Sequence, residues 1–269
     1  MRFRFPISAL IAISILMLGS LRFIRATTTP SGRATDESGR APILIELFTS
    51  EGCSSCPPAD ALLQRFDRSQ SVSGAELIVL SEHVDYWNDI GWTDPYSSHE
   101  YSERQSAYAA QFGLGSIYTP QMVVDGQFEL VGSDERRATQ AITDAAKRSK
   151  VPVSVSFGAS GDKSVTVHVE AGPLPSSIDT HAAAVFLAIA DNTDESHVSN
   201  GENAGRTLQH VAVLRKLARI GTVDESAAFS RDIMLDLNSK DARNLRMVAI
   251  VQETEVGRVL GAGMARLSN

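Results

Sequence analysis

The sequence is poor in cysteine and lacks long runs of one charge sign. Only two cysteines occur among the 269 residues, so any intramolecular disulfide must join Cys53 to Cys56, and no bridge can hold distant parts of the fold together. There is no long Lys/Arg run and the formal net charge is −7, which argues against a nucleic-acid partner. A composition that is 43% hydrophobic and 21% charged excludes a disordered protein, a collagen-like chain and a small disulfide scaffold.

The chain also lacks an apolar run long enough for an ordinary membrane span, and its start has the features of a secretory signal. Arg2 and Arg4 precede an apolar stretch, Phe5–Leu18, which is shorter than the roughly 20 residues of a spanning helix. A charged start followed by a short apolar run is typical of a signal peptide. We therefore expect residues 1–26 to be a signal peptide or, alternatively, an uncleaved anchor.

The segment after this signal points to export. No cysteine stands directly after the apolar run, which excludes a lipoprotein anchor. Residues 27–40 are rich in Thr, Ser, Gly and Arg, as in a flexible lead-in. We expect a periplasmic or secreted protein with no membrane span beyond an N-terminal anchor. Export would place the cysteine pair in an oxidising compartment, where two thiols can cycle through a disulfide.

Residues 41–150 alternate between strand and helix patterns. The runs Ile43–Phe48 and Leu77–Leu80 are apolar, as in buried strands. Between them, apolar residues from Ala59 to Phe66 repeat at helical spacing. The cysteine pair therefore lies where a strand is followed by a helix.

The rest of this segment continues the alternation. A helix is expected to end at Phe112, and the runs Met122–Val124 and Phe128–Val131 flank an Asp-Gly pair, which predicts a hairpin. A last helix would present Ala138, Ala141, Ile142 and Ala145 to the core. The predicted order is strand, helix, strand, helix, hairpin, helix.

This order and three motifs resemble a known family. Cys53–Asp60 reads Cys-Ser-Ser-Cys-Pro-Pro-Ala-Asp, His83–Trp87 reads His-Val-Asp-Tyr-Trp, and Tyr118–Met122 reads Tyr-Thr-Pro-Gln-Met. Together they resemble a bacterial family of secreted thioredoxin-like proteins of unknown function, in its two-domain form. The resemblance implies a thioredoxin-like α/β domain in which Thr119 and Pro120 form a cis-proline loop that faces the cysteines and positions the substrate.

The two cysteines have distinct expected roles. A helix N-terminus offers free N–H groups and a partial positive charge, which favour a thiolate. We assign Cys53 as the attacking nucleophile and Cys56 as the resolving thiol that attacks the mixed disulfide. Pro57 and Pro58 would disturb a helix that began at Cys53, so we expect the helix to begin near Pro57, where proline is tolerated.

Three interpretations of the Cys-x-x-Cys segment are open. A redox-active dithiol is favoured, because its place between strand and helix and the Pro120 loop both agree with it. A soft-metal site would use Cys53, Cys56 and His83, although the second half of a zinc motif is missing. A passive structural disulfide would close too small a loop to stabilise the fold much.

Four further side chains near these motifs form a second tier of candidates: His83, Asp85, Trp87 and Tyr118. His83 could assist proton transfer to a leaving thiolate. The alternative is that His83 and Asp85 hold a loop by hydrogen bonds and Trp87 fills a hydrophobic gap. Glu46 is a weaker candidate. A buried carboxylate near a dithiol can relay protons, but a carboxylate in such a strand more often points to a solvated end, where it has no role in proton transfer.

Residues 151–269 carry several short strand patterns separated by turn residues. This spacing predicts a mostly-β sandwich domain. One inserted helix is expected, because Val213, Leu214 and Leu217 would share a helix face. The polar, glycine-rich segment before it contains Arg206 and His210, which are weak candidates should it line a cleft between the domains.

The sequence therefore predicts an exported, two-domain thiol–disulfide oxidoreductase that uses a Cys53/Cys56 couple on a protein substrate or redox partner and needs no cofactor. The alternative is a non-enzymatic protein. It would be a thioredoxin-like binding module, or a copper or zinc carrier that uses both cysteines and His83.

Overall fold

The computed structural model describes residues 39–161, 164–236 and 244–267. The expected signal peptide, residues 1–26, lies outside the described residues, as does almost all of the lead-in, 27–40. No helix in the described part of the chain combines the length and the apolar character that a membrane crossing requires.

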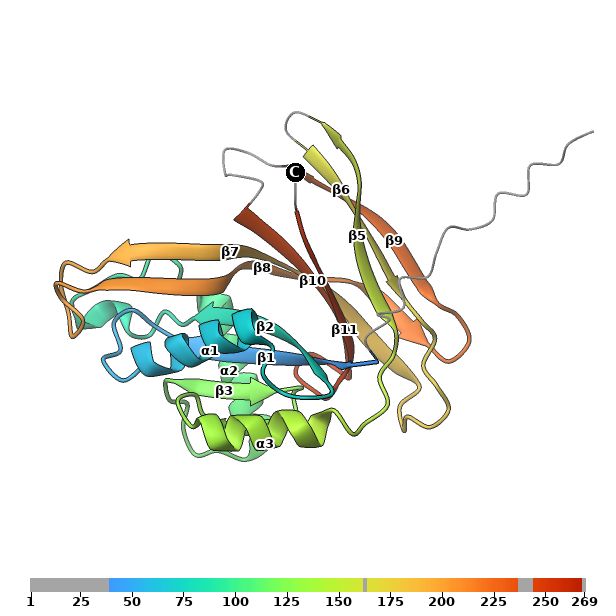
Figure 1. Ribbon diagram of the computed structural model, residues 1–269, viewed down its shortest axis with the longest axis horizontal. Coiled ribbons are helices and arrows are strands. Elements are labelled where there is room, and N and C mark those ends of the chain that lie inside the picture. Colours follow the sequence, from blue (N-terminus) through green and yellow to red (C-terminus); the bar gives the residue numbers. More distant parts are fainter. Residues whose placement is uncertain (1–38, 162–163, 237–243, 268–269) are drawn as a thin grey trace, which may run out of the picture. The chain divides into compact units, whose positions relative to one another are not determined.

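The first half of the described chain alternates between strands and helices in the predicted order (Figure 1). Its helix α1 begins at Pro57, as expected, with Cys56 at the N-cap position. The elements of this half are β1 Ala41–Thr49, α1 Pro57–Ser69, β2 Ala75–His83, the short 3-10 helix η1 Asn88–Ile90, α2 His99–Phe112, β3 Gln121–Val124, β4 Phe128–Val131 and α3 Glu135–Ala145.

The regular elements in the described residues of the second half are all strands. Its strands are β5 Val153–Gly161, β6 Ser164–Ala171, β7 Ala182–His197, β8 Thr207–Asp224, β9 Phe229–Asp236, β10 Leu245–Gln252 and β11 Val259–Arg266.

Most strands belong to one mixed sheet of eight, in the order β11-β10-β7-β8-β2-β1-β3-β4. β1 pairs with β2 in parallel and with β3 antiparallel, and β3 and β4 form the predicted hairpin. The result is a mixed α/β fold built on a large sheet, which confirms the expected fold class at this level.

Strand β1 is buried on both of its faces, which explains its apolar run. Ile43, Ile45 and Leu47 lie in one core cluster with residues of α1 and α3. Leu44 packs on the opposite face, in a cluster that contains Tyr101 of α2. The helices thus cover both faces of β1 and hold its C-terminal end, where the cysteine segment begins, in a fixed place.

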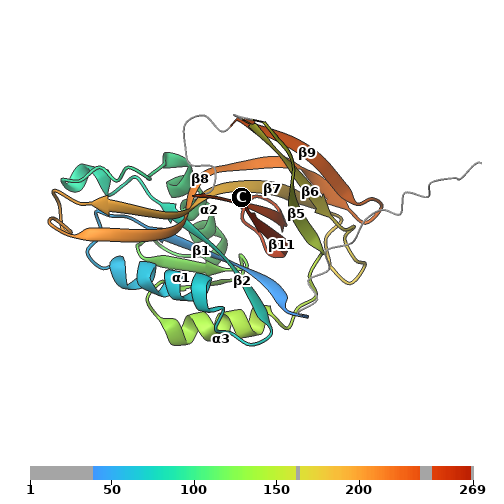
Figure 2. The same cartoon turned by 45° about the horizontal axis from the view of Figure 1, so that its top comes forward.

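The remaining strands, β5, β6 and β9, form a three-stranded sheet. Val165, Val167 and Val169 of β6 share a core cluster with residues of β7 and β10, such as Val185 and Val251. The three-stranded sheet therefore packs on the part of the large sheet that β7 and β10 contribute (Figure 2).

The expected helix over Val213, Leu214 and Leu217 is wrong, because these residues belong to strand β8. β8 pairs with β7 along most of its length, and the register shifts where Ala190 pairs with Leu214 but Ile189 with Lys216. This bulge and burial on both faces remove the simple alternation that identifies a strand. The remaining apolar spacing imitates a helix.

The large sheet also joins the two halves of the chain. β8 pairs with β2 through Ser81 and Val213, and the described residues belong to one compact unit. The division into residues 41–150 and 151–269 stays a prediction, but the hydrogen-bonded sheet runs across it. His210 and the segment before it are thereby brought to the end of β2, close to His83.

Candidate functional site

Cys53 and Cys56 form a disulfide between β1 and α1. Their Cα atoms are 5.4 Å apart, and both residues are 0% exposed, whereas Ser54 and Ser55 between them are exposed. The Cys56 carbonyl accepts the N–H groups of Ala59 and Asp60 at 2.8 and 3.1 Å. The disulfide thus lies at the N-terminus of α1, beneath an exposed Ser-Ser turn.

The connection between β7 and β8, residues 198–206, lies against this disulfide segment, and we call it the capping loop. Asn203 Nδ2 donates to the carbonyls of Glu51 and Cys53, at 2.8 and 3.0 Å. The Ser54 N–H donates to Glu202 Oε2 at 3.0 Å, and hydrogen bonding from Ser54, by its side chain first and its backbone second, lowers the pKa of Glu202. The second half of the chain therefore contacts the backbone of the cysteine segment directly.

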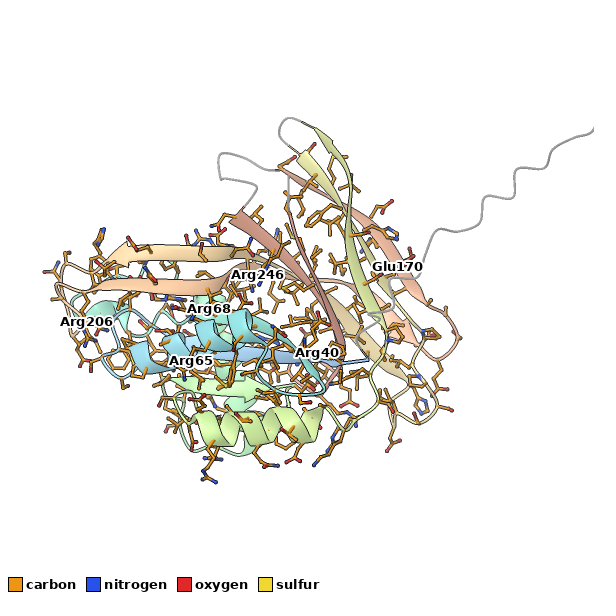
Figure 3. The ribbon with its side chains drawn as sticks, viewed as in Figure 1. Arg40, Arg65, Arg68, Glu170, Arg206 and Arg246 are labelled. Carbon is orange, nitrogen blue, oxygen red and sulfur yellow. A yellow bond between two sulfur atoms is a disulfide. The ribbon has the colours of Figure 1, made fainter. Side chains whose placement is uncertain are left out.

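Arg206 supports the capping loop from within. Its guanidinium donates to Asn203 Oδ1 at 2.8 Å, which fixes the carboxamide so that its nitrogen faces the two carbonyls. Figure 3 shows Arg206 at the end of the β7–β8 hairpin. The residue acts on the cysteine segment through Asn203.

A buried group of two histidines and three carboxylates lies next to the disulfide segment, and we call it the histidine–carboxylate cluster. His210 Nε2 contacts Glu51 Oε1 at 3.0 Å, and His83 Nδ1 contacts Asp94 Oδ2 at 2.7 Å. The two imidazole rings are 4.7 Å apart at an interplanar angle of 83°. The fifth member is Asp60, whose Oδ1 accepts from Thr49 Oγ1 at 2.9 Å.

The protonation of this cluster follows from burial and mutual charge. Burial works to lower the pKa of His83, but the Asp94 carboxylate reverses this, so the pKa of His83 is raised above 6.5. Burial raises the pKa of Asp94, but the positive charge of His83 outweighs it and the net direction is down. For Asp60, burial prevails over both histidines and raises the pKa. His83 and Asp94 therefore form an ion pair, and Asp60 binds its proton more tightly than a solvent-exposed aspartate does.

Trp87 connects the cysteine segment to the proline turn. The Thr119–Pro120 peptide bond is cis, and Trp87 Nε1 donates to Thr119 Oγ1 at 2.8 Å. A Cβ atom at Gly52 would lie 3.1 Å from the Trp87 Cβ, so Trp87 packs closely on the residue before Cys53. Trp87 both fills a gap and holds the turn.

Tyr118, the residue before this turn, is tied to the edge of the sheet. Its hydroxyl donates to Glu129 Oε2 of β4 at 2.6 Å, and its carbonyl accepts from Gln105 Nε2 of α2 at 2.7 Å. Tyr118 therefore fixes the turn between two elements.

Two candidates from the sequence do not contact this site. Glu46 is buried and receives hydrogen bonds from Arg104 and Tyr108 at 2.8 and 2.7 Å. Asp85 accepts from Ser102 at 2.5 Å and contacts His99 at 3.1 Å, so it holds the first turn of α2. The contacts of Glu46 are those of a packed interior, and the contacts of Asp85 are those of a helix end.

The described residues contain no group of three or more His, Cys, Asp or Glu side chains arranged to hold a metal ion. Cys53 and Cys56 are bonded to each other, and His83 is bonded to Asp94. The alternative soft-metal set of Cys53, Cys56 and His83 is therefore not supported by this geometry.

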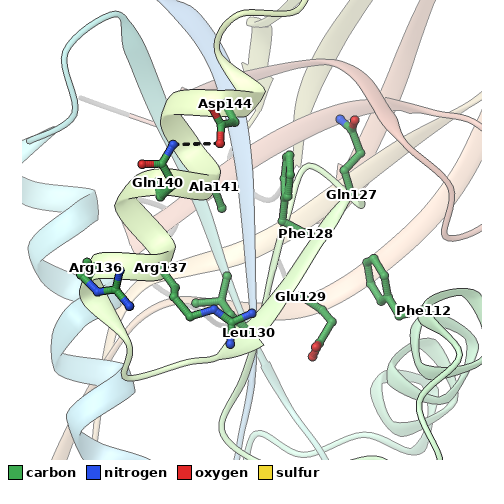
Figure 4. Close-up of a pocket in the computed structure, with 10 residues that line it drawn as sticks. All are labelled: Phe112, Gln127, Phe128, Glu129, Leu130, Arg136, Arg137, Gln140, Ala141 and Asp144. Atoms are coloured by element: carbon green, nitrogen blue, oxygen red, sulfur yellow. Dashed lines mark hydrogen bonds between the residues drawn. The ribbon is translucent and has the colours of Figure 1, made fainter.

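A groove of about 520 Å³ lies elsewhere, between α3 and the hairpin strand β4 (Figure 4). Phe112, Phe128 and Leu130 give it apolar walls, and Arg136 and Arg137 line one side. None of the site residues predicted from the sequence lines it, and it is separate from the disulfide.

Sequence analysis missed four side chains that contact the cysteine segment or its cluster: Glu51, Asp60, Asp94 and Asn203. Glu51 and Asp60 flank the two cysteines, and a local signal was present in the charged residues around the motif. Asp94 and Asn203 lie in irregular polar segments far away in sequence, and nothing in their local pattern indicates that the fold places them here.

Two solved structures are similar to this fold. One is a structural-genomics crystal structure of a protein from Agrobacterium tumefaciens, with a TM-score of 0.64 and 25% identity over 86% of this chain and 98% of that chain. The other is HBP35 of Porphyromonas gingivalis, with a TM-score of 0.61 and 14% identity over 85% of this chain and 76% of that chain. At 14% identity the second likeness concerns the fold alone.

The family comparison agrees with the resemblance seen in the sequence at its coarsest level. No match is found among curated proteins. The family described as "Protein of unknown function (DUF1223)" matches residues 44–252, which is most of the chain. The protein is therefore a member of the DUF1223 family.

Proposed function

We propose that this protein is an exported thiol–disulfide oxidoreductase that acts on a protein substrate through Cys53 and Cys56. The observation that carries the proposal is the disulfide at the N-terminus of α1, next to a buried group of acids and histidines. A helix N-terminus stabilises the thiolate that must leave when this disulfide is opened. Disulfides persist in oxidising compartments, which agrees with export.

The order and pairing of elements in the first half support the same proposal, and we propose that this half is thioredoxin-like. The parallel pair β1 and β2 is connected through α1, and the antiparallel hairpin β3–β4 pairs with β1 on its other side. The Thr119–Pro120 bond is cis and precedes β3. We propose that Thr119 and Pro120 position the substrate chain, with Trp87 and Tyr118 holding the turn.

The exchange begins from the oxidised form that the structure describes. A substrate thiolate attacks Cys53 Sγ, the Cys53–Cys56 bond breaks, and Cys56 leaves as a thiolate that takes up a proton. A second substrate thiol then attacks the substrate sulfur of the mixed disulfide and releases Cys53. The substrate dithiol loses two electrons and two protons, and the two cysteines gain them.

The reverse direction uses the same steps and requires a substrate disulfide. Cys53 is then the attacking thiolate, and Cys56 resolves the mixed disulfide. The neighbouring His83 and His210 are proposed to assist the proton movements, whereas the contacts of Glu46 and Asp85 give them structural roles.

Thiol trapping and a turnover assay test this function. The protein is isolated from its native compartment, and thiol blocking of one sample records its redox state. Exchange with reduced and oxidised peptide substrates is followed in a second, unblocked sample. We expect two-electron exchange that Cys53→Ser abolishes, and a mixed disulfide that accumulates in Cys56→Ser. A disulfide that exchanges with no dithiol or disulfide substrate, while its reduction only lowers thermal stability, would instead establish a structural bridge.

A further inference from the structure

The histidine–carboxylate cluster holds more ionisable groups than a purely structural role requires. Its members are Glu51, Asp60, His83, Asp94 and His210, and all are at most 7% exposed. Among the described residues, His83 Nε2 and His210 Nδ1 have no hydrogen-bond partner. Buried polar atoms are normally paired, so two unpaired ring nitrogens in one cluster indicate positions at which protons can be gained or lost.

Helix geometry places this cluster beside the cysteine that leaves. Asp60 follows Cys56 by four residues, and its N–H donates to the Cys56 carbonyl at 3.1 Å. Side chains four residues apart in a helix have Cβ atoms roughly 5–6 Å apart on the same face. The Asp60 side chain therefore lies on the same face of α1 as Cys56.

The other members follow from the ends of the neighbouring strands. Thr49, which donates to Asp60, pairs with His83 across β1 and β2. His210 of β8 reaches Glu51, two residues before Cys53. The cluster thus gathers side chains from β2, β8, the start of α1 and two loops beside the disulfide segment.

The charge balance of this site changes when the disulfide opens. Three carboxyl groups and two imidazoles share a buried space, and opening the disulfide adds two electrons and, on complete reduction, two protons. A thiolate at Cys56 is disfavoured by an ionised carboxylate nearby and favoured by an imidazolium. The protonation of the cluster therefore governs whether Cys56 leaves as a thiolate or a thiol.

We propose that the histidine–carboxylate cluster is the proton reservoir of the Cys53–Cys56 couple, with Asp60 and His210 as positioning residues of opposite sign. This inference deepens the proposed function and rests on it. When Cys56 leaves Cys53, it takes a proton from the cluster, and the cluster recovers one from the substrate thiol by way of solvent. Asp60 raises the proton affinity of Cys56, and His210 lowers it.

Other charged groups face the cluster and belong to the same electrostatic environment. The Tyr96 ring lies 5.3 Å from His83 and 5.6 Å from His210, and the Arg215 guanidinium lies over that ring at 5.4 Å. Asp194 adds a negative charge that acts on Tyr96. All three are left unchanged in the test.

Titration of a single thiol tests the proposal. Because the chain has two cysteines, Cys53→Ala leaves Cys56 alone, and its thiolate is followed by ultraviolet absorbance against pH. In this background we expect Asp60→Asn to lower the proton affinity of Cys56 about tenfold and His210→Gln to raise its proton affinity about tenfold. His168→Gln, at a half-buried histidine of β6 in the three-stranded sheet, is the matched control and is expected to leave the titration unchanged.

The opposite signs separate this role from a structural one. Loosening of the buried site would move the titration of both variants in one direction, and that result, or no movement in either, overturns the proposal. Folding of each variant is checked by circular dichroism. Glu51→Gln, expected to lower the proton affinity, replaces Asp60→Asn if that variant does not fold, and His210→Asn, expected to raise it, replaces His210→Gln. The titration needs no substrate: opposite shifts without turnover would reject only the proposed function, and turnover without shifts would reject only the reservoir.

Discussion

Burial of charged side chains is the main feature of this protein at the residue scale. Glu46 and Glu82 are both 0% exposed and lie on the face of the sheet that α2 covers, and Arg104 serves both of them. Its guanidinium is 2.6 Å from Glu46 but 3.8 Å from Glu82. Two carboxylates that share one cation in a dry interior cannot both ionise without cost.

Glu82 is the group on which this cost falls. Burial raises the pKa of Glu82 well above its usual 4.5, and the neighbouring Glu46 raises it further, while Arg104 opposes both. A carboxyl group whose pKa is higher in the folded state stabilises the fold fully below its unfolded pKa. That contribution is lost as the pH rises towards the folded pKa.

We expect Glu82→Gln to flatten the pH dependence of stability. The variant stays uncharged, so its Tm should match that of the wild type below about pH 4.5 and exceed it at pH 8 by at least ~2 °C. Thermal unfolding followed by circular dichroism across this range measures both curves. An equal loss of Tm at every pH would show that Glu82 contributes through packing and not through its charge.

At the element scale, the capping loop is the structure that covers the cysteine segment. Asn203 is 1% exposed and donates to two carbonyls, so its carboxamide replaces water at the backbone of Glu51 and Cys53. Removing one partner of a buried hydrogen bond costs about 1–3 kcal/mol for each group left unpaired. Access to the disulfide therefore depends on a loop from the other half of the chain.

We expect Asn203→Ala to expose the disulfide to small reductants. Loss of 1.4 kcal/mol from the closed loop would raise the open population about tenfold, and reduction by dithiothreitol should accelerate by a similar factor. Asn200→Ala is the matched control, because Asn200 is exposed in the same loop and bonds only to Ser199 among the described residues. Equal reduction rates in wild type and Asn203→Ala would show that the loop does not limit access.

At the scale of the whole molecule, the two halves share their cores as well as their sheet. Val211 and Ala212 of β8 lie in the cluster under α1 and α3, and Leu44 and Ile78 lie in a cluster with Phe186 of β7. Arg246 of β10 adds a buried ion pair with Asp67 of α1 at 2.7 Å, and Figure 3 shows it beside this helix. Few of these contacts could survive separation of the halves.

We therefore expect the chain to unfold in one transition, and its first half not to fold alone. A fragment of residues 39–150 would leave one edge of β2 unpaired and expose apolar side chains that β7 and β8 cover. Scanning calorimetry of the full chain should give a single peak, and hydrogen exchange of the fragment should show little protection. A protected fragment would establish an independent first domain.

Parts of the site could be predicted because their signals are local. The helix start at Pro57, the hairpin at Asp125 and Gly126 and the pairing of the only two cysteines each depend on neighbouring residues, and each is found in the structure. The β8 strand was mistaken for a helix because burial on both faces and a bulge hide its alternation.

The sequence by itself determined where a disulfide can form and that a strand and a helix flank it, since backbone preferences and residue spacing act over a few positions. Only the tertiary structure decided what surrounds that disulfide. Asn203 and His210 reach it because β7 and β8 extend the same sheet beside β2. Such pairing depends on the burial of distant strands, and no local pattern of residues encodes it.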